Sequence, residues 1–423
     1  MADAKFVPHA TTILSVIFNQ YFAQVVAGGE RGVDVLGFRL HGASFFTFVI
    51  SLSMTISAIL SPFLGAVADA SASKKRFLMT FCYVAVLSTG LLYFVREGHY
   101  WRGAILFGIA NIGFAGGNVY YNAFLPEIST ERNIGRISGL GWALGYIGGG
   151  VLLAINLIML QYPERLGFPP GFFSVQDCFL SVALWWFVFS LPTFLFLKER
   201  GVPKTEKGRS SFREGYRRLG ETLRRIKRFR ELAKFLVAFL IYNDGIGTII
   251  RMATAYGDEI GVDRTDMILA LIVTQFVGIP CTIAFGRLAP QLGTKPTILM
   301  GLGVYVLITV AGYFMETAGG FYVLALLVGL VQGGTQALSR SLYASMVPRA
   351  RTAEFFGFFS AGTKLAGVVG PVVFGLVGQA TGGSRTSILA VIVFFLVGSA
   401  LLLKVDVAEG QTRARREDEL GEV

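Results

Sequence analysis

Apolar stretches long enough to cross a bilayer recur along this chain, and they constrain its fold more than any other feature. A membrane-spanning helix needs about 20 predominantly apolar residues. The sequence predicts twelve spans, at roughly 7–28, 43–66, 77–95, 102–124, 136–160, 176–197, 233–256, 266–286, 296–315, 320–342, 354–379 and 384–404. Charged residues make up only 15% of the chain, against about 25% in soluble proteins. The pattern predicts an all-α membrane protein and excludes a soluble domain.

Lys and Arg are unevenly distributed between the loops. Of the 38 basic residues, 29 lie in the tails and in the loops after even-numbered spans, and seven lie in the opposite loops. Cytoplasmic loops carry the excess of basic residues, so both termini are expected in the cytoplasm. The short loops favour the cell (inner) membrane as the location. This asymmetry explains the net charge of +11 without a nucleic-acid partner.

One long polar interruption, residues 198–232, separates an N-terminal six-helix half (1–197) from a C-terminal six-helix half (233–404). Apolar residues in this linker recur at helical spacing opposite a face dense in Arg. The linker is therefore predicted to be a basic amphipathic helix that binds anionic lipid through residues 210–230. A soluble regulatory partner is the alternative. The charged tail 405–423 is expected to be disordered and cytoplasmic.

The two halves share landmarks at nearly constant offsets. Gly65 and Gly286 follow the second and eighth spans and are 221 residues apart. Pro126 and Pro348 follow the fourth and tenth spans and are 222 residues apart. The matching offsets favour duplication of a six-helix unit.

This organisation resembles the major facilitator superfamily. The loop after the second span is similar to that superfamily's signature, with Gly65, Asp69 and the basic cluster 74–76. Segments 118–127, 135–150 and 239–245 resemble the vacuole effluxer-like branch, whose members are autophagy-related amino-acid effluxers. That branch usually opens its first span with Asp-aromatic-Ala-Asn-Ser, but Phe6 and Val7 stand at the Asn and Ser positions here. No site is therefore transferred from that segment.

Three charged residues lie well inside predicted spans, away from the span ends, where a charge costs about 2.5–3.5 kcal/mol to insert. Asp244 and Arg251 share one face of the seventh span, and Lys364 lies near the middle of the eleventh. Each is expected to face a water-filled cavity or a partner, and Asp244 is the candidate for proton coupling. The alternative is a purely structural role.

Amide side chains are the remaining candidates for substrate binding or coupling. The resemblance implies that spans 1, 4, 7 and 10 line a central cavity, and most of these amides fall on those spans. They are Asn19, Gln20, Asn111, Asn118, Asn243, Gln275, Gln332 and Gln336. The alternative for each is a hydrogen bond that only holds neighbouring helices together.

A further set is predicted to be gating or structural. It comprises Gly65, Asp69, Lys75, Arg76, Asn122, Glu127, Arg136 and Arg340. In the loop after the second span, Gly allows close helix approach, and Asp caps the next helix or pairs with a cation. Trp142, at the position equivalent to Lys364, either stacks on substrate or packs.

The leading hypothesis is an ion-coupled secondary transporter that works by alternating access. The resemblance implies export of small polar solutes such as amino acids. The alternatives are multidrug-type efflux of amphipathic compounds, which the 37 Phe residues favour, and a non-transporting sensor. No clustered His, Asp or Glu suggests an enzyme, and no motif suggests a cofactor or a metal. The expected partners are a small-molecule substrate, protons and membrane lipids.

Overall fold

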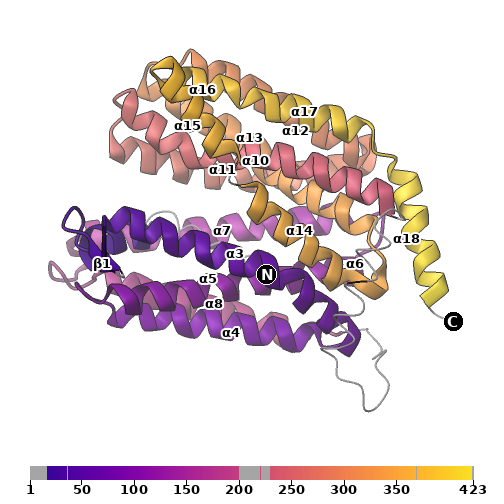
Figure 1. Ribbon diagram of the computed structural model, residues 1–423, viewed down its shortest axis with the longest axis horizontal. Coiled ribbons are helices and arrows are strands. Elements are labelled where there is room, and N and C mark those ends of the chain that lie inside the picture. The colour runs from indigo at the N-terminus through magenta and orange to yellow at the C-terminus, as the bar shows by residue number, and fades with distance from the viewer. Residues whose placement is uncertain (1–16, 36, 200–219, 221–228, 368, 422–423) are drawn as a thin grey trace. The chain divides into compact units, whose positions relative to one another are not determined.

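The computed structural model describes residues 17–35, 37–199, 220, 229–367 and 369–421 (Figure 1). Within these ranges, eleven helices are long and apolar enough to cross a membrane. They coincide with the predicted second to twelfth spans, so the predicted all-α membrane fold is confirmed. Residues 7–16 of the predicted first span lie outside the described residues, as does most of the linker 198–232 with its amphipathic helix.

Contacts along the chain define two compact units, and each is described by itself. Unit 1 comprises the described residues of 1–60, 73–121 and 144–199. Unit 2 comprises those of 61–72, 122–143 and 200–423. Unit 2 therefore includes two segments, 61–72 and 122–143, that the sequence places in the N-terminal half.

The helices of unit 1 begin with a short α2, which continues into a π-helix and a small hairpin. The hairpin pairs β1 with β2 in antiparallel register, with Asp34 opposite Arg39. The elements that lie wholly or partly in unit 1 are α2 (Phe18–Gln20), η2 (Tyr21–Val26), β1 (Val33–Val35), β2 (Phe38–Leu40), α3 (Gly42–Ser71), α4 (Lys74–Leu91), η3 (Leu92–Phe94), α5 (Tyr100–Ala123), α7 (Ile134–Gln161), η4 (Pro163–Leu166) and α8 (Val175–Phe196).

Aromatic side chains form the core of unit 1. Phe18 on α2 is fully buried and stacks on Phe107 of α5 with ring centroids 5.2 Å apart. It also meets the edge of Phe179 on α8 at 5.4 Å. Such stacked and edge-to-face pairs are the favoured aromatic geometries, and they tie three helices of unit 1 together.

The described elements of unit 2 are all helices. The short α6 (Leu125–Ile128) and the ends of α3, α5 and α7 belong to it. The others are α10 (Arg230–Glu259), α11 (Arg264–Leu292), α12 (Thr294–Tyr313), α13 (Ala318–Ser345), η6 (Arg349–Arg351), α14 (Thr352–Ala366), α15 (Val369–Thr381), α16 (Ser384–Ala390), α17 (Ile392–Leu403) and α18 (Val407–Gly421).

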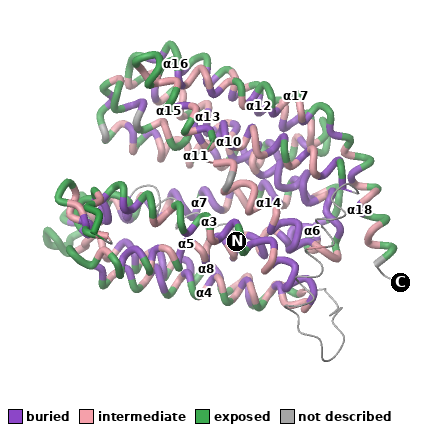
Figure 2. Tube along the Cα trace, in the orientation of Figure 1, coloured by how far each residue is buried: buried purple, intermediate pink, exposed green. Residues whose placement is uncertain are grey.

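Burial distinguishes the inner from the outer helices of unit 2 (Figure 2). Much of α13 is buried, whereas α17 keeps several apolar side chains exposed, as a lipid-facing helix does. Phe239 of α10 stacks on Phe359 of α14 with centroids 4.5 Å apart. The eleventh span consists of two helices, because α14 ends at Ala366 and α15 begins at Val369.

The prediction that the tail 405–423 is disordered is wrong. Residues Val407–Gly421 form α18, which turns away from the direction of α17 in Figure 1. The sequence of α18 is highly charged, but several of its charged side chains have partners in unit 2. Arg415 pairs with Glu131, and Asp418 accepts backbone N–H groups from Arg349 and Ala350. Ala414 is buried, so the helix has one face against the protein.

Candidate functional site

A buried carboxylate on α10 forms the centre of the candidate site in unit 2. Asp244 is 3% exposed, and its Oδ1 lies 3.6 Å from a guanidinium nitrogen of Arg251, two turns along the same helix. The ion pair confirms the prediction that the two residues share a helix face. The Arg251 side chain is 45% exposed, so the pair joins a buried anion to an accessible cation.

The amino end of α15 supplies the second partner of Asp244. The Gly370 N–H donates to Asp244 Oδ2 at 2.7 Å. Helix amino termini carry free N–H groups and a partial positive charge, which suits a carboxylate. A Cβ at Gly370 would overlap Thr248 Oγ1 and lie 3.0 Å from Asp244 Oδ1. Glycine at this position therefore allows the backbone of α15 to approach α10.

An amide pair links α10 to α13 one residue before the carboxylate. Gln336 Nε2 donates to Asn243 Oδ1 at 2.7 Å. The Tyr242 hydroxyl lies 2.6 Å from Ser339 Oγ on the same α13. Both predicted amides are half-buried, so their hydrogen bond fixes the facing sides of the two helices beside Asp244.

The other predicted polar residues of the C-terminal half lie on α14, α13 and α11. Lys364 is half-buried on α14, and its Nζ donates to Ser360 Oγ of the same helix at 2.8 Å. Gln332 lines a mostly apolar pocket of about 110 Å³ together with Thr248. Gln275 is half-buried on α11.

A second polar cluster in unit 2 centres on Arg340 of α13, which is 7% exposed. Its guanidinium donates to Ser138 Oγ and to the Ser138 carbonyl oxygen, both at 3.0 Å. It also donates to Asn122 Oδ1 at 3.1 Å and lies 5.9 Å from the centre of the Trp142 ring. Arg340 therefore binds two segments, at Asn122 and Ser138, that the sequence assigns to the other half.

Two residues of the loop after the second span, Gly65 and Asp69, contact the start of α14 in the predicted C-terminal half. Asp69 Oδ2 accepts the N–H of Glu354, in the first turn of α14, at 2.8 Å. A Cβ at Gly65 would overlap the carbonyl oxygen of Ala353. Gly65 thus allows the close helix approach that the sequence predicted.

The remaining predicted gating residues take less central positions. Lys75 Nζ donates to the Leu197 carbonyl at 2.8 Å within unit 1. Arg76 and Arg136 are exposed, and Glu127 is half-buried.

The remaining predicted amides belong to unit 1. Asn111 Nδ2 donates to Ser53 Oγ at 2.7 Å, with both side chains buried. Asn118 is half-buried, and Asn19 and Gln20 are exposed on α2. The Asn111 bond joins α5 to α3, which is the packing role weighed for such amides.

Sequence reasoning missed two hydroxyl residues of these clusters. Thr248 donates to the Asp244 carbonyl at 2.7 Å and packs against Gly370. Ser138 accepts from Arg340 and donates to the Ala337 carbonyl at 2.6 Å. The only sequence signal for Thr248 was its position four residues after Asp244, which places both on one face of the helix. Among the described residues, no group of three or more His, Cys, Asp or Glu could hold a metal ion.

Comparisons with known proteins agree on the family. Residues 26–415 match the family model described as "Vacuole effluxer Atg22 like". The uncharacterized MFS-type transporter YxiO of Bacillus subtilis is 34% identical, over 93% of this chain and 90% of its own length. Autophagy-related protein 22 of Yarrowia lipolytica is 23% identical, over 90% of this chain and 79% of its own length.

A solved structure agrees with the fold. The Escherichia coli fucose:proton symporter FucP is similar with a TM-score of 0.70 and 14% identity, over 96% of this chain and 97% of its own. At that identity the likeness establishes the major facilitator fold alone. With the family match over most of its length, the chain belongs to the vacuole effluxer Atg22-like family of major facilitator superfamily secondary transporters.

Proposed function

We propose that this transporter exports small polar solutes such as amino acids, and that Asp244 couples their movement to protons. The observation that carries the proposal is the buried carboxylate with two different partners, the Arg251 guanidinium and the Gly370 N–H. An ionisable side chain inside a membrane helix is costly, and such residues commonly mark substrate or proton pathways.

The geometry supports a role for both charges. Ionised Asp244 attracts Arg251 and accepts from the amino end of α15, so it favours a close association of α10 with α15. Protonation of Asp244 removes that charge and weakens both interactions. A zwitterionic substrate would bind the pair while Asp244 is ionised. A proton on Asp244 would compete with the ammonium group of the substrate, so that a proton enters as a substrate leaves. An amino acid provides a counter-charge for each member of the pair.

The names of related proteins support efflux and proton coupling separately. The matching family is described as vacuole effluxers, and FucP is named as a proton symporter. Alternating access in such folds uses a site near the middle of the membrane. Asp244 lies in the middle of the 30-residue helix α10, which agrees with that depth.

Counterflow in proteoliposomes tests the substrate class. Vesicles would be loaded with a mixture of amino acids, and single labelled amino acids would be offered outside. Transient accumulation of a label, absent from protein-free vesicles, is expected for a carrier. If the folded protein accumulates no amino acid but exchanges amphipathic cations or dyes, multidrug-type efflux replaces this proposal.

A pH gradient tests coupling and direction. In right-side-out vesicles, acid on the outer side is expected to drive labelled substrate outward. Asp244→Asn keeps the side-chain size and removes the charge, so it should abolish the response to the gradient. Asp258→Asn is the matched control, since it removes an exposed carboxylate from the same helix. Gradient-driven efflux that persists in Asp244→Asn would remove the coupling role, and gradient-driven uptake would reverse the direction.

A further inference from the structure

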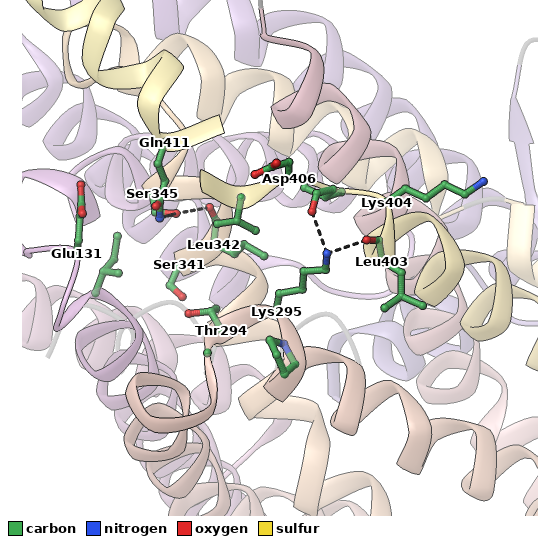
Figure 3. Close-up of a pocket in the computed structure, with 15 residues that line it drawn as sticks. Glu131, Thr294, Lys295, Ser341, Leu342, Ser345, Leu403, Lys404, Asp406 and Gln411 are labelled. Atoms are coloured by element: carbon green, nitrogen blue, oxygen red, sulfur yellow. Dashed lines mark hydrogen bonds between the residues drawn. The ribbon is translucent and has the colours of Figure 1, made fainter. Parts of the chain in front are cut away.

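The carboxyl-terminal helix α18 is fixed to unit 2 from its first residues. Lys295 Nζ donates to the carbonyl oxygens of Leu403 and Val405, at 2.8 and 2.9 Å, just before α18 begins (Figure 3). The Asp406 N–H donates to Glu231 Oε2 at 2.8 Å. These bonds involve α12, α10 and the end of α17, so they set the direction in which α18 leaves the membrane helices.

Two further contacts hold α18 along its length. Gln411 Nε2 donates to Ser345 Oγ at 3.2 Å, at the end of α13. The Asp418 carboxylate accepts the backbone N–H groups of Arg349 and Ala350 at 3.1 and 3.2 Å. Apart from Glu231, at the end of the predicted linker, these partners lie in the predicted C-terminal half. We therefore take that half as the part of the chain to which α18 is attached.

One contact of α18 reaches a different part of the chain. Arg415 forms a two-pronged ion pair with Glu131, with Nε to Oε1 at 3.0 Å and NH2 to Oε2 at 2.5 Å. Glu131 lies between α6 and α7, in the segment 122–143 that the sequence assigns to the N-terminal half. Glu131 also lines, with Gln411 and Asp406, a pocket of about 660 Å³ (Figure 3). The parallel fork is the strongest geometry available to an Arg–carboxylate pair.

We propose that α18 is a latch, which is anchored on the predicted C-terminal half and clasps the loop of Glu131, and which thereby favours the transporter state closed at this end. In that state the buried contacts of Arg340 with Ser138 and of Asp69 with Glu354 join the same two parts of the chain. If the halves separate here during transport, the Arg415–Glu131 pair must break with them. The proposal rests on alternating access within the proposed function.

The latch shifts the equilibrium between the transporter states closed and open at this end, and it does not hold the closed state by itself. The Arg415 and Glu131 side chains are 60% and 51% exposed, and exposed pairs contribute little individually because water and salt screen them. Loss of the pair is therefore expected to raise the population open at this end by about two- to five-fold. A helix that merely covers the protein end would show no dependence on the sign of the charges at positions 415 and 131.

Chemical labelling of a buried cysteine can measure this population. Ala337 is 1% exposed, and its carbonyl accepts the Ser138 hydroxyl across the α13–α7 contact. A thiol reagent should therefore reach Ala337→Cys only when the two segments separate. Labelling would be measured peptide by peptide in full-length, detergent-solubilised protein that still exchanges substrate. The native Cys82 and Cys178, both buried in unit 1, serve as internal references.

Charge reversal and its repair provide the decisive comparison. In the Ala337→Cys background, Arg415→Glu and Glu131→Arg should each speed labelling of the introduced cysteine, and the double variant should return it to the starting rate. Arg385→Glu is the matched control, because Arg385 forms an exposed pair with Glu316 at 3.2 Å within the predicted C-terminal half alone. Arg385→Glu is expected to leave labelling unchanged.

Two results would overturn the latch. Labelling that is the same in native and charge-reversed proteins, or a double variant whose effect is the sum of the two single ones, would show that the pair does not bias the gate. Both results leave the proposed transport function intact. If the introduced cysteine is never labelled in any variant, even with substrate present, separation at this end does not occur, and alternating access fails along with the latch.

Discussion

The Gly370 position shows how one missing side chain can shape a buried charged site. The backbone of α15 approaches Thr248 so closely that a Cβ would overlap the Thr248 hydroxyl oxygen. The approach delivers the Gly370 N–H to Asp244 Oδ2. Asp244 itself cannot move away freely, because its other oxygen lies 3.6 Å from Arg251. Binding of the carboxylate and packing of the helices are therefore coupled at this residue.

Gly370→Ala is expected to lower both stability and transport. Overpacking of a buried contact costs about 1–3 kcal/mol, and displacement of α15 would also lengthen the bond to Asp244. Gly375→Ala is the matched control on the same helix, since a Cβ there has no atom within 4 Å. Thermal unfolding and counterflow would be measured for both variants. Equal behaviour of the two alanine variants would contradict the tight contact.

The residues that sequence alone identified differ physically from those it missed. Asp244 and Arg251 stood out because a charge in a membrane helix is costly and needs a reason. Thr248 and Ser138 did not, because a hydroxyl can satisfy itself on the carbonyl oxygen of its own helix and is common in membrane spans. Thr248 matters because it packs against Gly370, and Ser138 matters because it binds Arg340. The sequence alone does not show that these residues are in contact.

Whole helices could be predicted where local sequence determines them, and could not be predicted where they depend on contacts with residues distant in sequence. Hydrophobic length predicted the second to twelfth spans, because a helix that crosses the membrane satisfies its own backbone hydrogen bonds. The order of α18 could not be predicted, because its contacts are made far along the chain. Glu131, which binds Arg415, is 284 residues away in sequence. A charged tail without such partners would remain disordered.

The connection between α10 and α16 should depend on pH. Hydrogen bonds from the Ser384 hydroxyl and backbone N–H lower the pKa of Glu259, at the end of α10, from its ordinary 4.5. The bond from the backbone N–H measures 2.9 Å. Because the folded pKa is lowered, this stabilisation is present above pH 4.5 and is lost as pH falls through the lowered value.

Glu259→Gln tests that dependence without changing the side-chain size. Since Glu259 is exposed, the variant should lose less than about 1 kcal/mol at pH 7. The difference in unfolding temperature from the native protein should shrink below pH 4.5. Asp258→Asn, at the exposed neighbouring position, is the control variant measured alongside it. A difference for Glu259→Gln that is constant from pH 7 to pH 3 would contradict the assignment.

At the scale of the whole molecule, the distribution of basic residues predicts the orientation of the protein in the membrane, which the packing of the helices does not. The helices would be equally apolar in either orientation, so only the loops can distinguish the two sides of the membrane. The tails and the loops after even-numbered spans carry 29 of the 38 Lys and Arg residues. The same reasoning predicts that α18 and Glu131 lie on the cytoplasmic side, and the β1–β2 hairpin on the opposite side.

Cysteine labelling in intact cells can check this orientation. Leu420 near the end of α18 is 75% exposed, and Phe38 in the hairpin is 73% exposed, so single cysteines at these positions should be equally reactive once reached. A membrane-impermeant maleimide should label Phe38→Cys in intact cells and Leu420→Cys only after permeabilisation. Cys82 and Cys178 are buried and Cys281 is half-buried, which keeps the background low. The opposite order of labelling would place the carboxyl terminus outside, and with it the latch.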